Sequence, residues 1–195
     1  MTLARKAYFS EGNVTPGGTC ICSFVFLRLG NHILVGMPTK PELWSQRFGV
    51  PPERASEVGG GRYVLPASHL NWFEAPEEAA ARVLREQLDL ELPASKLKLI
   101  EVQSHVSDNP NPERSHWDIS FVYLADMPAA AAKKLIAQDW FSGLSFVSPR
   151  RLKSGDFLWG HGDVLEKARK KIGKHATRRS APGRKKSRSP ARKAR

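Results

Sequence analysis

The chain has 195 residues, 41% of them hydrophobic and 26% charged, which is typical of one globular domain and too short for two well-packed ones. Its formal net charge of +12 comes from one end, because residues 167–195 hold 14 of the 31 Lys and Arg residues and no acidic residue. Residues 1–166 therefore carry 17 basic and 19 acidic side chains. Two cysteines exclude a disulfide framework and a four-cysteine zinc site. With no signal-peptide core and no apolar run long enough to span a bilayer, we expect a cytoplasmic location.

The first predicted element is a β-hairpin. Residues 19–29 are rich in β-branched and aromatic residues, Gly30 and Asn31 give a turn, and residues 32–37 are apolar again. Strong β formers on both sides of a two-residue turn are typical of a hairpin. We therefore expect two antiparallel strands at the beginning of the domain.

A long connection separates the hairpin from the clearest helix. Residues 38–62 contain four prolines and three consecutive glycines, which predicts a loop with a short helix near Glu53. Residues 62–65 predict a short strand that ends at Pro66. Residues 76–90 predict a helix, because a proline suits its first turn, two glutamates complement the helix dipole and alanines fill its middle.

The next segment alternates strands with a short helix. Residues 97–106 and 117–124 predict two strands, and the second is expected to be central because both of its faces are apolar. A helix is expected over residues 129–137, and a further strand over residues 144–147. The order of elements predicts an α/β (α+β) fold.

A last helix and a basic segment follow. Asp163 and Glu166 have the three-residue spacing of a capping box, which predicts the beginning of a helix. Beyond Gly173 the residues are polar or basic without apolar periodicity, and such a segment cannot bury enough surface to offset its ordering entropy. We therefore expect a domain over residues 1–166, followed over residues 167–195 by the end of the last helix and a disordered polybasic tail.

One segment resembles a family signature. Residues 65–90 read LPASHLNWFEAPEEAAARVLREQLDL, which is similar to the box of the Nudix pyrophosphohydrolases, G-x5-E-x7-R-E-U-x-E-E-x-G-U, where U is a bulky aliphatic residue. The matching positions are Glu74, Arg82, Leu84, Glu86 and Leu90. The departing positions are Ser68 for Gly, Val83 for the Glu after Arg, Gln87 for the second Glu of the pair and Asp89 for the late Gly. The box is therefore degenerate.

The resemblance implies a Nudix-like α/β/α sandwich with a mixed sheet, and magnesium-dependent hydrolysis of a nucleoside diphosphate linked to another group. Magnesium prefers oxygen ligands, and residues three or four apart share a helix face, so the family's helix carboxylates converge on the ions. This chain keeps only Glu86 of those three, which implies weak or atypical hydrolysis. Glu86 is then the expected catalytic and metal-binding residue, assisted by the backbone carbonyls of Ala67 and Ser68. Glu74 and Arg82 are expected to hold the loop of the box in place.

Alternative interpretations stay open. Ion pairs of Glu78, Arg82 and Glu86 at i,i+4 spacing are also typical of an ordinary exposed helix face. A second alternative is a non-catalytic module that binds a nucleotide or associates with nucleic acid. GDP-mannose mannosyl hydrolases also resemble Nudix enzymes, lack the Glu after Arg and cleave a sugar carbon–oxygen bond with fewer metal ligands. Val83 departs in that direction, whereas Gln87 does not.

Other residues give weaker expectations about ligands. Trp140 and Phe141 could stack on a nucleobase or pack in the core, and His69 could touch phosphate. Trp72 could cover the site or anchor its loop. Cations that release counterions from phosphates predict polyanion contact, with DNA or RNA, through the tail. The tail residues chosen for that contact are Arg178, Arg179, Arg184, Lys185, Lys186 and Arg188.

Overall fold

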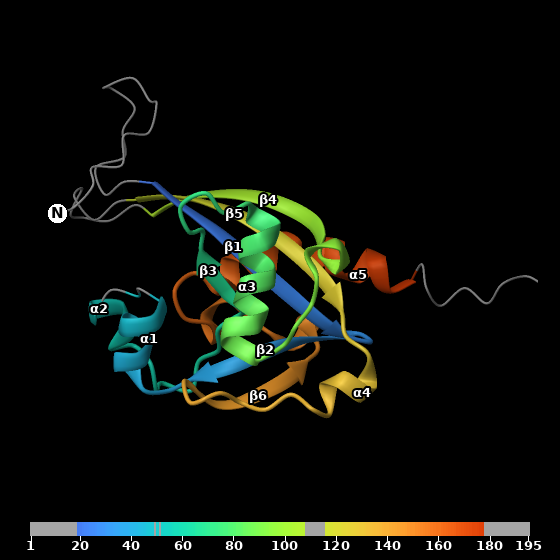
Figure 1. Ribbon diagram of the computed structural model, residues 1–195, viewed down its shortest axis with the longest axis horizontal. Coiled ribbons are helices and arrows are strands. Elements are labelled where there is room, and N and C mark those ends of the chain that lie inside the picture. The colour runs from blue at the N-terminus through green and yellow to red at the C-terminus, as the bar shows by residue number, and fades with distance from the viewer. Residues whose placement is uncertain (1–18, 49, 51, 108–115, 178–195) are drawn as a thin grey trace, which may run out of the picture.

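A mixed sheet of six strands forms the centre of the computed structural model, which describes residues 19–48, 50, 52–107 and 116–177 (Figure 1). Its strands are β1 (Thr19–Leu29), β2 (His32–Pro38), β3 (Ala67–His69), β4 (Lys98–Ser107), β5 (His116–Asp126) and β6 (Phe141–Val147). The α-helices are α1 (Pro41–Phe48), α2 (Pro52–Ala55), α3 (Pro76–Leu88), α4 (Ala129–Ala132) and α5 (His161–Thr177). Short 3-10 turns are η2 (Ala94–Lys96), η4 (Pro149–Arg151) and η5 (Ser154–Asp156). No helix within the described ranges is long and apolar enough to cross a bilayer.

Strand β1 organises the sheet, whose order is β4-β5-β1-β2-β6. It runs parallel to β5 along most of its length, and it pairs antiparallel with β2 only near Arg28. At its other end, β1 pairs antiparallel with β3, where Ser23 lies opposite Ser68. The hydroxyl of Ser23 also donates to the carbonyl oxygen of Pro76 over 2.7 Å, so the beginning of α3 is fixed beside β3.

Helices cover the two faces of the sheet. Successive residues of β1 alternate between these faces: Val25 and Leu27 belong to the core beneath α3, whereas Phe24 and Phe26 belong to the core beneath α5. Figure 1 shows α3 on the near side of the strands and α5 behind them. This arrangement confirms the predicted α/β/α sandwich with a mixed sheet.

The hairpin and the long helix are close to their predicted bounds, and the short helix expected near Glu53 is present as α2, but the rest of the connection between them differs. Residues 38–62 hold two helices, and the unpredicted α1 buries Trp44 to 3% exposure because its ring packs on Phe141. The expected strand at 62–65 is reduced to isolated bridges, and the strand of this region is β3, after Pro66.

Two expectations near the end of the chain are wrong in detail. Helix α5 begins at His161, so Asp163 lies within its first turn, where its carboxylate accepts a hydrogen bond of 2.5 Å from the Ser154 hydroxyl instead of capping the helix. The expected division after residue 166 already assigned the end of this helix to the second segment, and it stays a prediction. Within α5, Ala168 and Ile172 are buried in the core. The helix expected over 129–137 is only the four residues of α4.

A buried histidine joins the beginning of α5 to the segment that leads into β3. The Nδ1 atom of His161 accepts a hydrogen bond of 2.9 Å from the backbone N–H of Leu65, and its ring meets that of Phe24 edge to face at 4.9 Å. Burial, with a smaller contribution from the positive charge of Arg54, lowers the pKa of His161 to about 3. The imidazole is therefore neutral in the folded chain at ordinary pH.

This histidine should make stability depend on pH. The unfolded chain takes up a proton at the ordinary histidine pKa of 6.5 and the folded chain does not, so stability is complete above that value and is lost as the pH falls towards 3. We expect His161 to contribute a loss of about 1.4 kcal/mol per pH unit below its ordinary pKa. Urea unfolding between pH 7.5 and 4.5 measures this slope. His161→Gln keeps an acceptor for Leu65 without titrating, and an equally steep slope in that variant would contradict the assignment.

Candidate functional site

Helix α3 carries the box, and local contacts determine where it begins and ends. At the beginning, the backbone N–H of Ala75 donates to the Glu78 carboxylate over 3.0 Å. At the end, Asp89 takes a left-handed conformation with φ of 51°, and its N–H donates to the carbonyl oxygen of Arg85 over 3.0 Å. Aspartate tolerates this conformation better than most side chains. Asp89 therefore ends the helix at the position where the signature has glycine.

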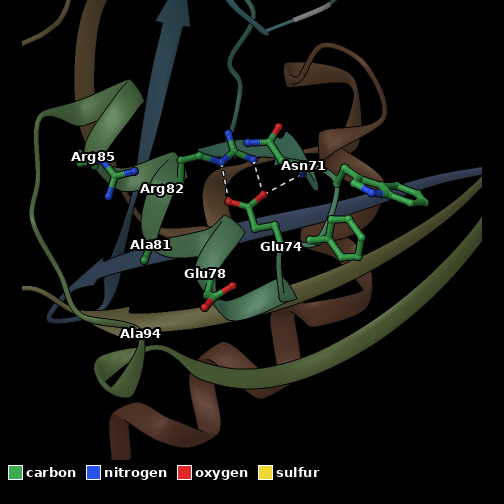
Figure 2. A pocket seen from close by; sticks show the side chains of 9 residues that line it. Asn71, Glu74, Glu78, Ala81, Arg82, Arg85 and Ala94 are labelled. Carbon is green, nitrogen blue, oxygen red and sulfur yellow. Dashed lines mark hydrogen bonds and ion pairs between the residues drawn. The ribbon is translucent and has the colours of Figure 1, made fainter. Parts of the chain in front are cut away.

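Glu74 and Arg82 join the loop to the helix (Figure 2). The Nε and Nη2 atoms of Arg82 lie 2.7 and 2.9 Å from the two carboxylate oxygens of Glu74, and both side chains are about nine-tenths buried. Arg82 also donates to the carbonyl oxygen of His69 over 2.8 Å, and Glu74 accepts from the N–H of Asn71 over 2.8 Å. The hydrogen bonds from Arg82 hold the pKa of Glu74 below its usual value, while those to Glu74 raise the pKa of Arg82.

Glu86 is the box carboxylate that was expected to bind metal. Its Oε2 atom accepts a hydrogen bond of 2.9 Å from Nη1 of Arg82, and its side chain is 43% exposed. The same guanidinium therefore serves Glu74 and Glu86. A metal ion at Glu86 would have to compete with this ion pair.

Gln87, the residue after Glu86, pairs its side-chain amide with the backbone of Ala67. Its Nε2 atom donates to the carbonyl oxygen of Ala67 over 2.7 Å, and its Oε1 atom accepts from the N–H of Ala67 at 3.4 Å. The side chain is only 1% exposed. The Gln87 carbonyl in turn accepts the indole N–H of Trp140 over 3.2 Å. The Ala67 carbonyl, which was expected to assist a metal, is thus paired with an amide of the protein itself.

The residues at the box do not fit a magnesium site. Magnesium requires several oxygen ligands in near-octahedral geometry. Val83 is fully buried and offers none, Gln87 uses its amide on Ala67, and Glu86 is paired with Arg82. Across the described ranges, no group of three or more His, Cys, Asp or Glu side chains is arranged to hold a metal ion.

The remaining residues that were expected to contact a ligand do not come together in an open site. Trp140 and Phe141 are each 6% exposed and belong to the core beneath α3, so as placed they pack and do not offer a stacking face. His69 is exposed on β3, where its carbonyl accepts from Arg82. Ser68 pairs with β1. The six tail residues chosen for polyanion contact lie outside the described residues, as do residues 108–115.

A surface feature beside this site was not predicted from the sequence. Trp72 and Phe73 point into solvent, 87% and 93% exposed, so Trp72 neither covers the site nor anchors its loop by burial. An open hollow of about 460 Å³ lies between this loop and the outer face of α3 (Figure 2). It is lined by Asn71, Trp72, Phe73, Glu74, Glu78, Ala81, Arg82, Arg85 and Ala94. The sequence signal was the pair of adjacent aromatics in a polar loop.

Comparison with known proteins establishes the fold of the chain. No family model matches the chain. A MutT Nudix hydrolase from Burkholderia pseudomallei has a similar structure at 17% identity, with a TM-score of 0.51 over 76% of this chain and 96% of that one. A MutT/Nudix family protein from Enterococcus faecalis matches at 14% identity, with a TM-score of 0.54 over 80% of this chain and 62% of that one.

A bifunctional NMN adenylyltransferase/ADP ribose pyrophosphatase from Francisella tularensis is also similar, at 16% identity with a TM-score of 0.50. That match covers 80% of this chain and 43% of the other. The chain thus spans less than two thirds of the Enterococcus and Francisella proteins. These structural matches show that the chain has the Nudix fold.

Proposed function

We propose that this chain is a Nudix-fold module that binds a nucleotide-linked small molecule without the magnesium-dependent hydrolysis typical of the family. The observation that carries the proposal is the hydrogen-bonded pair between the Gln87 amide and the backbone of Ala67. An amide donor on that carbonyl does what a bound cation would do electrostatically, because it places positive charge against the oxygen's lone pair. The amide is always present, and unlike a metal ion it does not activate a water for hydrolysis.

The scaffold of the box is kept while its ligands are lost. Glu74 and Arg82 retain their contacts, which need no metal. Val83 and Gln87 have become part of the buried underside of α3. A module that keeps its loop geometry but only Glu86 of the three helix carboxylates is better suited to binding than to turnover.

The class of ligand comes from a relative. The Francisella protein was solved as a complex with AMP and a manganese ion. The same protein is described as an ADP ribose pyrophosphatase, and ADP-ribose is a nucleoside diphosphate linked to a sugar. That is the ligand class that we propose for this chain, with AMP as its simplest probe.

Hydrolysis and binding assays test the proposal together. We expect no turnover of dinucleotides or sugar nucleotides with magnesium or manganese, and measurable heat of AMP or ADP-ribose binding in calorimetry. The double variant Val83→Glu, Gln87→Glu shows whether restored carboxylates bring back metal-dependent turnover. Turnover by the unchanged chain that Glu86→Gln abolishes would contradict the proposal, and absence of nucleotide binding would contradict its ligand.

A second candidate function keeps weak or atypical hydrolysis, of the pyrophosphohydrolase or the GDP-mannose mannosyl hydrolase kind. It is favoured by Glu86, whose carboxylate is 43% exposed and so remains accessible to an ion that displaces Arg82. Contact of the basic tail with DNA or RNA is compatible with either candidate, because it depends on charge alone.

A further inference from the structure

Two adjacent aromatic side chains form an unusual surface feature. The rings of Trp72 and Phe73 meet edge to face, with centroids 5.1 Å apart, and both are almost fully exposed. Phe73 has a φ of 61°, a left-handed conformation that is unfavourable for a bulky residue. The loop is nevertheless held in place, because Glu74 bonds both the N–H of Asn71 and the guanidinium of Arg82. Large apolar side chains presented in this way mark a binding surface.

The hollow beside the aromatic pair is lined by two glutamates and two arginines, Glu74, Glu78, Arg82 and Arg85, whereas the exposed charges further along α3 are mainly acidic. Residues 74–91 include six acidic and two basic side chains. The exposed acids are Glu77, Glu78, Glu86, Asp89 and Glu91, and together with Trp72 and Phe73 they are called the aromatic–acidic surface. Aromatic faces attract cations, and carboxylates do the same. This surface therefore fits a basic peptide and repels the phosphates of a nucleic acid.

The chain supplies a basic peptide of its own. Residues 178–195 contain nine Lys or Arg residues and no acid. They follow α5, which lies against β4, where Lys171 pairs with Glu101 over 2.5 Å. The helix also contacts the end of β1, because Arg28 donates to the carbonyl oxygen of Ile172 over 2.9 Å.

The path from α5 to the aromatic–acidic surface is short. β4 is an edge strand and begins at Lys98, directly after η2. Ala94 of η2 lines the hollow beside α3. Eighteen extended residues reach about 60 Å, whereas α3 is about 20 Å long. The segment is therefore long enough to pass the edge of the sheet and run along the outer face of α3.

We propose that residues 178–195 dock on the aromatic–acidic surface of the same molecule, with arginine guanidinium groups over Trp72 and Phe73. The docked segment neutralises the acids of α3 and covers the aromatic pair. The acids of this surface compete with any polyanion for the cations of the tail. Docking therefore limits how tightly the tail contacts DNA or RNA.

Tryptic cleavage of the tail in the full chain tests the docking. The rate of cleavage after Arg178 and Arg179 is followed by mass spectrometry, with an isotope-labelled peptide of unrelated, uncharged sequence around a single arginine added as an internal reference for trypsin activity. In low salt we expect the double variant Trp72→Ser, Phe73→Asn to be cleaved about fivefold faster than the unchanged chain, the effect of losing one to two exposed cation–π contacts. In 0.5 M salt the difference should disappear, because the Debye length falls to a few ångströms.

The variants are chosen so that folding does not obscure the result. Asparagine accepts the left-handed conformation of Phe73 better than phenylalanine does, so that change should not weaken the loop. Ile136→Ser removes another exposed apolar side chain, 73% exposed and outside the hollow, and should leave the cleavage rate unchanged. Equal cleavage of the unchanged chain and the double variant in low salt would overturn the proposal and leave the surface for a basic segment of another protein. Protection that vanishes on dilution would overturn docking within one molecule.

Discussion

Replacing Gln87 with glutamate is expected to destabilise the domain by about 3 kcal/mol at neutral pH, because the change puts an unpaired charge in a buried position. The new carboxylate has no N–H for the carbonyl oxygen of Ala67, which now lies 2.7 Å from the Gln87 amide nitrogen. Burial raises the pKa of the new acid, so the deficit relative to the unchanged chain should shrink as the pH falls and the neutral acid becomes a donor. Urea unfolding of both proteins across pH 5 to 8 measures the difference.

The same variant should respond to divalent cations. A carboxylate beside the Ala67 carbonyl and near Glu86 supplies oxygen ligands that the amide does not, so we expect millimolar magnesium or manganese to raise its melting temperature. The unchanged chain should show no such shift. Gln87→Leu is the matched control, because it also removes the hydrogen bonds of Gln87. Its loss of stability relative to the unchanged chain should be the same at every pH and with or without metal. A metal-dependent shift in the unchanged chain would contradict our interpretation of Gln87.

Replacing Arg82 with methionine is expected to cost about 3 kcal/mol, because it leaves the nearly buried carboxylate of Glu74 without its partner. Folding holds the pKa of Glu74 below its usual 4.5, so the stabilisation by this pair is present above pH 4.5 and is lost as the pH falls further. The gap between the unchanged chain and Arg82→Met should therefore narrow in acid. Thermal unfolding of both proteins at pH 7 and pH 3.5 measures this difference in stability at each pH.

Glu86→Gln provides the matched control for this network. It removes only the exposed i,i+4 pair with Arg82, so we expect a loss of about 0.5 kcal/mol or less. If Glu86→Gln were as costly as Arg82→Met, the arginine would be acting mainly through Glu86, and the assignment of the loop contact to Glu74 would be wrong.

Several elements could be predicted because their signals are local. The hairpin around Gly30 and the helix beginning at Pro76 follow from turn residues, β formers and helix formers that are close in sequence. Helix α1 was missed because its sequence is rich in polar residues and follows a proline. Its stability comes from Trp44, which packs on Phe141, a residue far away in the chain.

At the candidate site, too, the sequence predicted local features but not contacts between residues far apart in the chain. Spacing placed Arg82 and Glu86 on one helix, and the resemblance implied that Glu74 and Arg82 hold the loop before it. It did not show that Trp140 would be buried with its indole on the carbonyl of Gln87, because burial depends on which strands surround a segment.

The order of elements and the degenerate box were determined by the sequence by itself, since both depend on residue types at short spacing. Only the tertiary structure decided that the Gln87 amide pairs with Ala67 and that Trp72 and Phe73 face solvent. The physical reason is that a hydrogen bond across 20 positions and the exposure of a loop depend on how β3 and α3 pack together. No local pattern of residues contains that information.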